Sequence, residues 1–148
     1  GVQFGDSEIR KIVEVGAHLV LCPRSNDHLQ VGRAPVEKLK KAGVQLALGT
    51  DSMASNQNLS LWDELAHAYT RYGDVFSARE LLGLATLGGA KALGLQDDLG
   101  DLKKGLCCSF QVVRPDQAVK TETLYENLIA EGQNRQVEAL ILDGVSVL

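Results

Sequence analysis

Two short apolar runs, each stopped by polar residues, decide the fold of this chain: Ala17-His18-Leu19-Val20-Leu21-Cys22, before Pro23, and Val44-Gln45-Leu46-Ala47-Leu48, before Gly49-Thr50-Asp51-Ser52. Such runs are typical of strands that are buried on both faces of a parallel sheet. Segments with helical spacing lie before and between them. The order helix, strand, helix, strand predicts right-handed crossovers and a parallel α/β fold.

Helices are predicted around these strands from apolar spacing, caps and glycine stops. The polar segment between the first strand and the next helix, residues 24–33, is predicted to be a loop. The predicted helices cover residues 7–15 with Asp6 as cap, 35–41 ending at Gly43, 60–72, and 77–93 opened by a Ser77–Glu80 capping box.

The character of the sequence changes after about residue 95. Turn residues at 100–105 lead into a predicted strand at 108–113, and 123–130 is ambiguous, with a short helix as one reading. Residues 137–148 predict a hairpin around Asp143-Gly144, since Asp-Gly favours a type I′ turn. We therefore predict two segments, 1–95 and 96–148, the second of them mostly β.

Two parallel strands with their helices do not close a sheet, so both edges of the predicted sheet stay open. The missing strands would come from a preceding part of a longer protein or from another copy. The sequence therefore predicts a fragment that associates, either with that N-terminal part or as a homo-oligomer.

Composition excludes some classes of partner. Fifteen Lys and Arg stand against 19 Asp and Glu, a net charge of -4 with no basic run, which argues against nucleic acid. No apolar run approaches the roughly 20 residues of a membrane span. Three cysteines, Cys22 and the adjacent Cys107 and Cys108, make a poor disulfide framework, so we predict a cytoplasmic protein with buried, unreactive thiols.

The polar ends of the two strands are the predicted site. In parallel α/β folds the carboxyl ends of the strands carry the chemistry. Asp51 can ligate a metal or accept a proton there, or it can simply cap the following turn. Arg24, Ser25 and Asn26 follow the other strand, where a hydrogen-bonded loop is the plainer reading.

The remaining titratable residues give weaker signals. His18 is predicted to be a core or sheet-face residue, His28 to be solvated in a loop, and His67 to lie on a helix surface or in helix packing. The pairs Asp63-Glu64 and Asp97-Asp98 are predicted to be solvated charges at a helix start and in a loop.

Ordered motifs along nearly the whole chain resemble the amidohydrolase superfamily. The nearest subgroup holds chlorohydrolases, S-adenosylhomocysteine/methylthioadenosine deaminases, and guanine and aminofutalosine deaminases. Leu106-Cys107-Cys108-Ser109-Phe110 departs from the family pattern, which usually has a basic residue and then Ala-Asp here. The motifs that carry the resemblance are Leu21-Cys22-Pro23-Arg24-Ser25-Asn26, Gly32-Arg33-Ala34-Pro35, Leu48-Gly49-Thr50-Asp51-Ser52, Ala54-Ser55-Asn56, 85–95, and 100–105 with 110–113.

The resemblance implies a fold and a set of site residues. The chain would be the C-terminal part of a (β/α)8 TIM barrel, its last two strands and helices, followed by part of a small β-sandwich domain. Asp51 matches the aspartate that ends the eighth barrel strand, which binds the metal and shuttles a proton. Arg24 and Asn26 match the loop near substrate, and Ser52 is expected beside them. The family's other ligands, an H-x-H pair and two histidines, have no counterpart in this sequence.

The function implied is hydrolytic deamination, or dechlorination, of a purine, nucleoside or related heterocycle. One divalent metal, zinc or iron, would activate the water, and this chain alone is predicted to be inactive. One alternative is a non-catalytic amidohydrolase-like scaffold used for assembly. Another is an unrelated small α/β binding domain in which Asp51 is only a turn cap.

Overall fold

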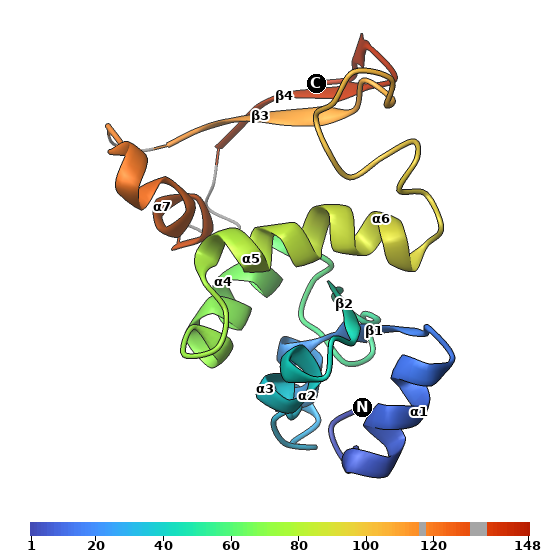
Figure 1. Ribbon diagram of the computed structural model, residues 1–148. Helices are drawn as coiled ribbons and strands as arrows, with labels where there is room; N and C mark the ends of the chain where they lie inside the picture. Colours follow the sequence, from blue (N-terminus) through green and yellow to red (C-terminus); the bar gives the residue numbers. More distant parts are fainter. Residues whose placement is uncertain (116–117, 131–135) are drawn as a thin grey trace.

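The two predicted strands form a parallel pair in the first half of the computed structural model, which describes residues 1–115, 118–130 and 136–148 (Figure 1). Strand β1 (His18–Leu21) pairs with β2 (Gln45–Leu48) in register from His18 opposite Gln45 to Leu21 opposite Leu48. Within the described ranges this sheet has no third strand, so the predicted open edges are present.

Burial differs between the two strands. In β2 the side chains of Leu46, Ala47 and Leu48 are buried, as predicted. In β1 only Leu21 is buried, whereas His18 is exposed and Val20 is 48% exposed. The prediction of burial on both faces is therefore wrong for β1, because no described segment covers Val20.

The first helices correct two predictions. Helix α1 (Asp6–Glu14) begins one residue earlier than expected, with Gly5 as its N-cap, and the Glu8 carboxylate accepts a hydrogen bond from the Gly5 N–H at 3.0 Å. The predicted loop over 24–33 begins instead as helix α2 (Pro23–His28). Pro23 suits a first helical turn, since its fixed φ is helical and no N–H is needed there.

Three helical segments follow in α3 (Val36–Lys41), α4 (Leu61–Tyr72) and α5 (Ala78–Gly83). Ser60 caps α4 by accepting a hydrogen bond from the Asp63 N–H at 3.2 Å. The predicted capping box at Ser77 and Glu80 is confirmed, with both reciprocal hydrogen bonds present. No helix among the residues described is long and apolar enough to span a membrane.

The helix that begins with α5 continues through a π-helical segment, η1 (Leu84–Gly88), into α6 (Gly89–Ala92). This segment contacts β2. A Cβ atom on Gly88 would lie 2.7 Å from the Leu46 carbonyl oxygen, so only glycine allows the helix to approach the strand this closely.

One apolar core joins β2 to the helices. Its most deeply buried side chains come from α3, α4, α5 and the later helix α7 (Leu124–Ala130). They are Leu39, Ala68, Tyr72, Ala78, Leu81 and Ile129, each at most 1% exposed.

The second half contains an antiparallel sheet in the order β3 (Phe110–Arg114), β4 (Gln136–Leu142), β5 (Val145–Ser146). The predicted hairpin is confirmed, with φ of 49° at Asp143 and 81° at Gly144, as a type I′ turn requires. The described residues form one sheet here, and the sandwich partner expected from the resemblance is not among them.

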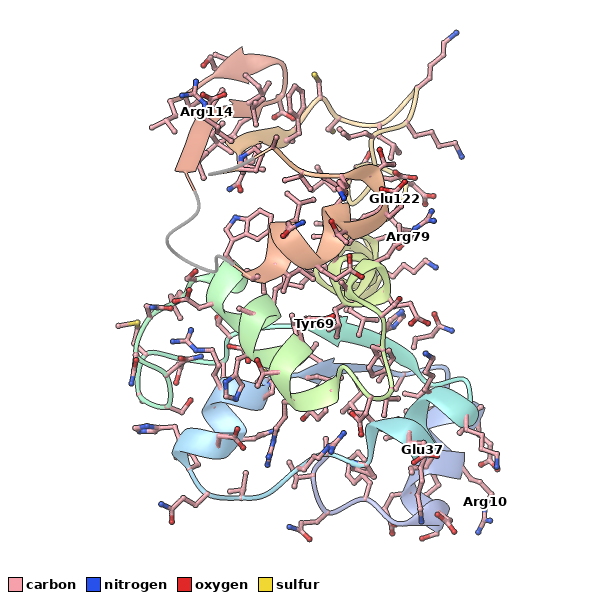
Figure 2. All side chains as sticks on the ribbon, turned by 90° about the vertical axis from the view of Figure 1, so that its left-hand side faces the viewer. Arg10, Glu37, Tyr69, Arg79, Arg114 and Glu122 are labelled. Carbon is pink, nitrogen blue, oxygen red and sulfur yellow. The ribbon has the colours of Figure 1, made fainter. Side chains whose placement is uncertain are left out.

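Helix α7 (Leu124–Ala130), preceded by the 3-10 turn η2 (Thr121–Thr123), settles the ambiguous segment as helical. It lies between the sheet and helices α4 and α5, with Ile129 fully buried in the shared core (Figure 1). The Arg79 guanidinium stacks over the Tyr125 ring at 5.7 Å. Arg10 and Arg114 mark the opposite ends of the molecule (Figure 2).

Candidate active site

The carboxyl ends of β1 and β2 meet at Asp51. Asp51 follows β2 by three residues, and Ser25 lies in the first turn of α2, directly after β1. The hydroxyls of Ser25 and Ser55 donate to Asp51 Oδ2 at 2.8 and 3.0 Å, and the two hydroxyl oxygens lie 2.9 Å apart. Asp51 is therefore held both from its own loop and from helix α2, which follows the neighbouring strand.

The backbone of Asp51 is left-handed, with φ of 60°. This conformation is uncommon outside glycine, and in native structures such residues gather at functional sites. Here it lies directly beside the hydroxyl cluster. The arrangement goes beyond a simple turn cap, because the main hydrogen bond comes from a residue 26 positions away.

The charge state of Asp51 suits a role as a metal ligand. Hydrogen bonds from Ser25 and then Ser55 lower the pKa of the Asp51 carboxyl, with a smaller contribution from the Ser52 backbone. The side chain is exposed, so burial opposes this only weakly. Asp51 is accordingly ionised at neutral pH, and neither hydroxyl occupies its second oxygen, Oδ1.

Asn26 and Ser52, two of the predicted substrate-binding residues, lie close to Asp51. Asn26 is half-buried and lines a pocket of about 280 Å³ together with Asp51 and Cys22. Ser52 is exposed and adjacent in the chain. Asn26 is therefore placed where a small molecule at Asp51 would meet it, and the roles of both residues stay predictions.

Arg24, the third predicted substrate residue, points toward α4. Its guanidinium donates to Asn58 Oδ1 at 2.9 Å and lies 3.9 Å from Asp63, with 13% of the side chain exposed. The structure thus places the Arg24 side chain in a contact of α2 with the start of α4 and the residues before it. Its substrate role remains a prediction.

The prediction that Asp63 and Glu64 are solvated is wrong. Glu64 is 0% exposed, and its oxygens accept hydrogen bonds from the Arg24 backbone N–H at 2.9 Å and from Asn56 Nδ2 at 3.1 Å. Burial raises the pKa of Glu64, and these two hydrogen bonds oppose the rise. The signal was available, because Glu64 stands four and eight residues before the buried Ala68 and Tyr72, on the same face of the helix.

The histidines are arranged much as expected. His18 lies on the exposed face of β1, and His28 is exposed at the end of α2. His67 packs between helices, with Nε2 2.8 Å from Asp27 Oδ2. None of the three contacts Asp51 through a described hydrogen bond.

The prediction that all the thiols are buried is wrong for two of them. Cys107 and Cys108 are exposed, because they lie in the loop before β3 rather than inside a strand. Cys22 is half-buried and lines the pocket with Asp51, and burial raises the pKa of its thiol to about 11, helped by the charges of Glu64 and Asp51.

The fit to a metal is limited to one ligand. The described residues contain no group of three or more His, Cys, Asp or Glu side chains that could hold an ion. A catalytic zinc site generally takes about three protein ligands and keeps one open position. Asp51, ionised and anchored through one oxygen, fits a single ligand position of such a site.

The amidohydrolase family model matches residues 1–147 of this chain. Among curated proteins, the 5-methylthioadenosine/S-adenosylhomocysteine deaminase of Halobacterium salinarum is 42% identical over 119 residues, which are 76% of this chain and 27% of that protein. The chain spans only about a quarter to a third of the length of the curated relatives it matches.

Solved structures also resemble this chain, and each of the three that follow matches 99% of its length. Guanine deaminase from E. coli has a TM-score of 0.89 at 28% identity, with 37% of that chain covered. An adenosine deaminase from Xanthomonas campestris with bound zinc has a TM-score of 0.86 at 32% identity, with 35% covered. A mutant atrazine chlorohydrolase from Arthrobacter aurescens, complexed with zinc and atraton, has a TM-score of 0.89 at 26% identity, with 34% covered. With a family model matched from end to end and such neighbours, this chain belongs to the amidohydrolase family.

Proposed function

We propose that residues 1–148 supply one wall of the active site of a metal-dependent hydrolase that acts on C–N bonds. Strands β1 and β2 would be two strands of a (β/α)8 barrel whose other strands and metal ligands lie in other segments. The named relatives, deaminases of purine compounds and a chlorohydrolase, support hydrolytic removal of an amino or chloro group from a heterocycle.

One observation carries this proposal. Asp51 stands at the carboxyl end of β2 with Oδ2 fixed by one hydroxyl from its own loop and one from helix α2. A side chain that only capped its own turn would need no partner from the helix after β1. The double anchoring instead orients the carboxylate, as a ligand or proton acceptor requires.

Each residue has a distinct task in this proposal. Asp51 contributes one ligand and accepts the proton of the attacking water. A bound divalent metal, zinc or iron, would lower the pKa of that water. Asn26 would contact the heterocycle, since it lines the pocket together with Asp51, and Ser52 would do so from the position next to Asp51 in the chain. Ser25 and Ser55 hold the carboxylate in place.

A chimaera tests the proposal. The segment of the Xanthomonas campestris adenosine deaminase that matches this chain would be replaced by residues 1–148, and zinc content and release of ammonia from adenosine would be measured. We expect zinc to bind and turnover to appear, while the 148-residue chain alone shows none. The change Asp51→Asn should then lower kcat by about 10²–10⁴-fold, the usual range for loss of an acid–base group.

Asp97→Asn is the matched control, since Asp97 is an exposed aspartate outside the site. It should leave turnover unchanged. Full turnover by the Asp51→Asn chimaera would refute the role of Asp51. A folded, zinc-loaded chimaera without activity on adenosine or chlorinated heterocycles would favour the scaffold alternative.

A further inference from the structure

Glu64 is a fully buried carboxylate in the first half of α4, outside the direct contacts of Asp51. A carboxylate removed from water is costly unless hydrogen bonds compensate it. Its two described partners are the Arg24 N–H and Asn56 Nδ2, which belong to the segments after β1 and β2 respectively. One side chain therefore links the start of α2 and the loop after β2, the two segments that form the candidate site.

The link on the β2 side passes through Asn56. Its Nδ2 donates to the Thr50 carbonyl at 2.8 Å as well as to Glu64, and its Oδ1 accepts from the Gln57 N–H at 2.9 Å. These three partners fix the orientation of the amide. Because Thr50 directly precedes Asp51, Glu64 is connected through Asn56 to the backbone next to Asp51.

The link on the β1 side is shorter. The Arg24 N–H is bound by Glu64 at 2.9 Å, and the next residue, Ser25, donates to Asp51 at 2.8 Å. Both routes from Glu64 therefore converge on Asp51, one through its backbone and one through its carboxylate.

We propose that Glu64 is a positioning residue for Asp51: it holds the first turn of α2 and the loop after β2 at a fixed separation, so that Ser25 reaches Oδ2 and the left-handed backbone of Asp51 persists. The proposal deepens the function proposed above, on which it depends for the meaning of Asp51. Its geometry stands independently, in the distances among Arg24, Asn56 and Glu64.

The test is Glu64→Gln in the 148-residue chain. Glutamine keeps an oxygen for the Arg24 N–H but turns a second amide NH2 toward Asn56 Nδ2. Asn56 cannot invert to accept from it, because Nδ2 is needed at Thr50 and Oδ1 at Gln57. We expect the amide resonances of Thr50, Asp51 and Ser25 and the carboxyl carbon of Asp51 to shift in the folded protein at neutral pH.

A matched control separates positioning from stability. Leu39→Val removes a methylene from a fully buried side chain on α3, outside the described hydrogen bonds of the site, and should lower the urea midpoint without moving the Asp51 resonances. Asn56→Ala serves if Glu64→Gln does not fold, since it breaks only the Thr50 route and should still shift Asp51.

The proposal would be overturned if the folded variant has a lowered urea midpoint but the same Asp51 and Ser25 resonances as the wild type. Glu64 would then only stabilise the packing of α4. The measurement needs neither metal nor substrate. An inactive chimaera would therefore refute the proposed function without touching this inference, and the converse also holds.

Discussion

The two halves of the molecule differ in where they bury polar groups. Every buried polar or charged side chain among the described residues lies around Asp51, from helix α2 to the start of α4. The strands β3, β4 and β5 contain no fully buried side chain in their described positions. The buried polar residues are Ser25, Ser55, Asn56 and Glu64.

This difference distinguishes residues that position the candidate site from residues that only stabilise the fold. A buried polar group left without a hydrogen bond costs about 1–3 kcal/mol, so a cluster of four is retained only when its partners are well placed. In the antiparallel sheet the described polar contacts are exposed, such as the Arg114–Glu138 ion pair. We infer that the first half fixes the site, while the second half depends on that half for its packing through Ile129.

Core truncation should give the largest difference between the halves. Leu39→Ala, at a side chain that is 0% exposed, should lower the free energy of unfolding by about 2–5 kcal/mol, through lost burial and a residual cavity. Val112→Ala, at a side chain that is 41% exposed on β3, should cost less than about 1 kcal/mol. Urea unfolding followed by circular dichroism measures both.

The wild-type chain and both variants should be compared at several protein concentrations, because the open edges of the β1–β2 sheet are expected to favour association. Equal losses of unfolding free energy in the two variants would show that the sheet has a core of its own, and would contradict the proposed difference between the halves.

Local patterns predicted much of the fold from the sequence. The capping box at Ser77 and the Asp143-Gly144 turn each depend on neighbouring residues, and both are present as expected. The parallel pairing of β1 and β2 followed from the order of elements. The prediction of a loop after Pro23 was wrong for residues 24–28, which are helical. Their polar composition masked a segment in which the backbone N–H groups of Asn26 and Leu29 donate helical hydrogen bonds.

The candidate site was only partly predictable. Asp51 was predicted from its place after a buried strand, and its role stays a prediction. Its hydrogen-bond partners depend on tertiary distance, since Ser25 lies 26 residues away. Glu64 was misread because its charge outweighed its helical spacing with Ala68 and Tyr72. A pattern of residue types cannot show that a carboxylate is compensated by hydrogen bonds from 8 and 40 residues away.

Thiol reactivity tests the comparison a second time, because Cys22 is half-buried at the site in the first half, whereas Cys107 and Cys108 lie in an exposed loop of the second half. The pKa of Cys22 is raised to about 11 from an ordinary 9.0, chiefly by burial. Its thiolate fraction at neutral pH is therefore roughly 100-fold below that of an unperturbed thiol, and thiolate is the reacting species. Cys107 and Cys108 are exposed. Intact mass after brief treatment with iodoacetamide should show two rapid additions and a much slower third.

Cys22→Ser identifies the slow thiol, since this variant should retain both rapid additions and lose the third. Three additions at one rate in the wild-type chain would mean that burial does not slow the reaction of Cys22.

The smallest expected effect is the pH dependence contributed by Glu80. Hydrogen bonds from Lys40 and Ser77 lower the pKa of Glu80 to about 2, so the folded state favours its charged form. Its stabilisation is therefore complete above the ordinary pKa of 4.5 and is lost as the pH falls from there through about 2. Because the side chain is 48% exposed, solvent screening should keep the contribution below about 1 kcal/mol. Glu80→Gln should be less stable than the wild type at pH 7, and the gap should narrow by pH 2.5.

Glu37→Gln provides the control for Glu80, because Glu37 is an exposed glutamate on the neighbouring helix α3 (Figure 2) and has no capping role in the structure. Urea midpoints of the three proteins at pH 7, 4.5 and 2.5 give the comparison. A gap between wild type and Glu80→Gln that stays constant across this range would show that the Ser77 cap and the Lys40 ion pair do not act through the charge of Glu80. The helix start would then be held by hydrogen bonding alone, as the neutral amide also permits.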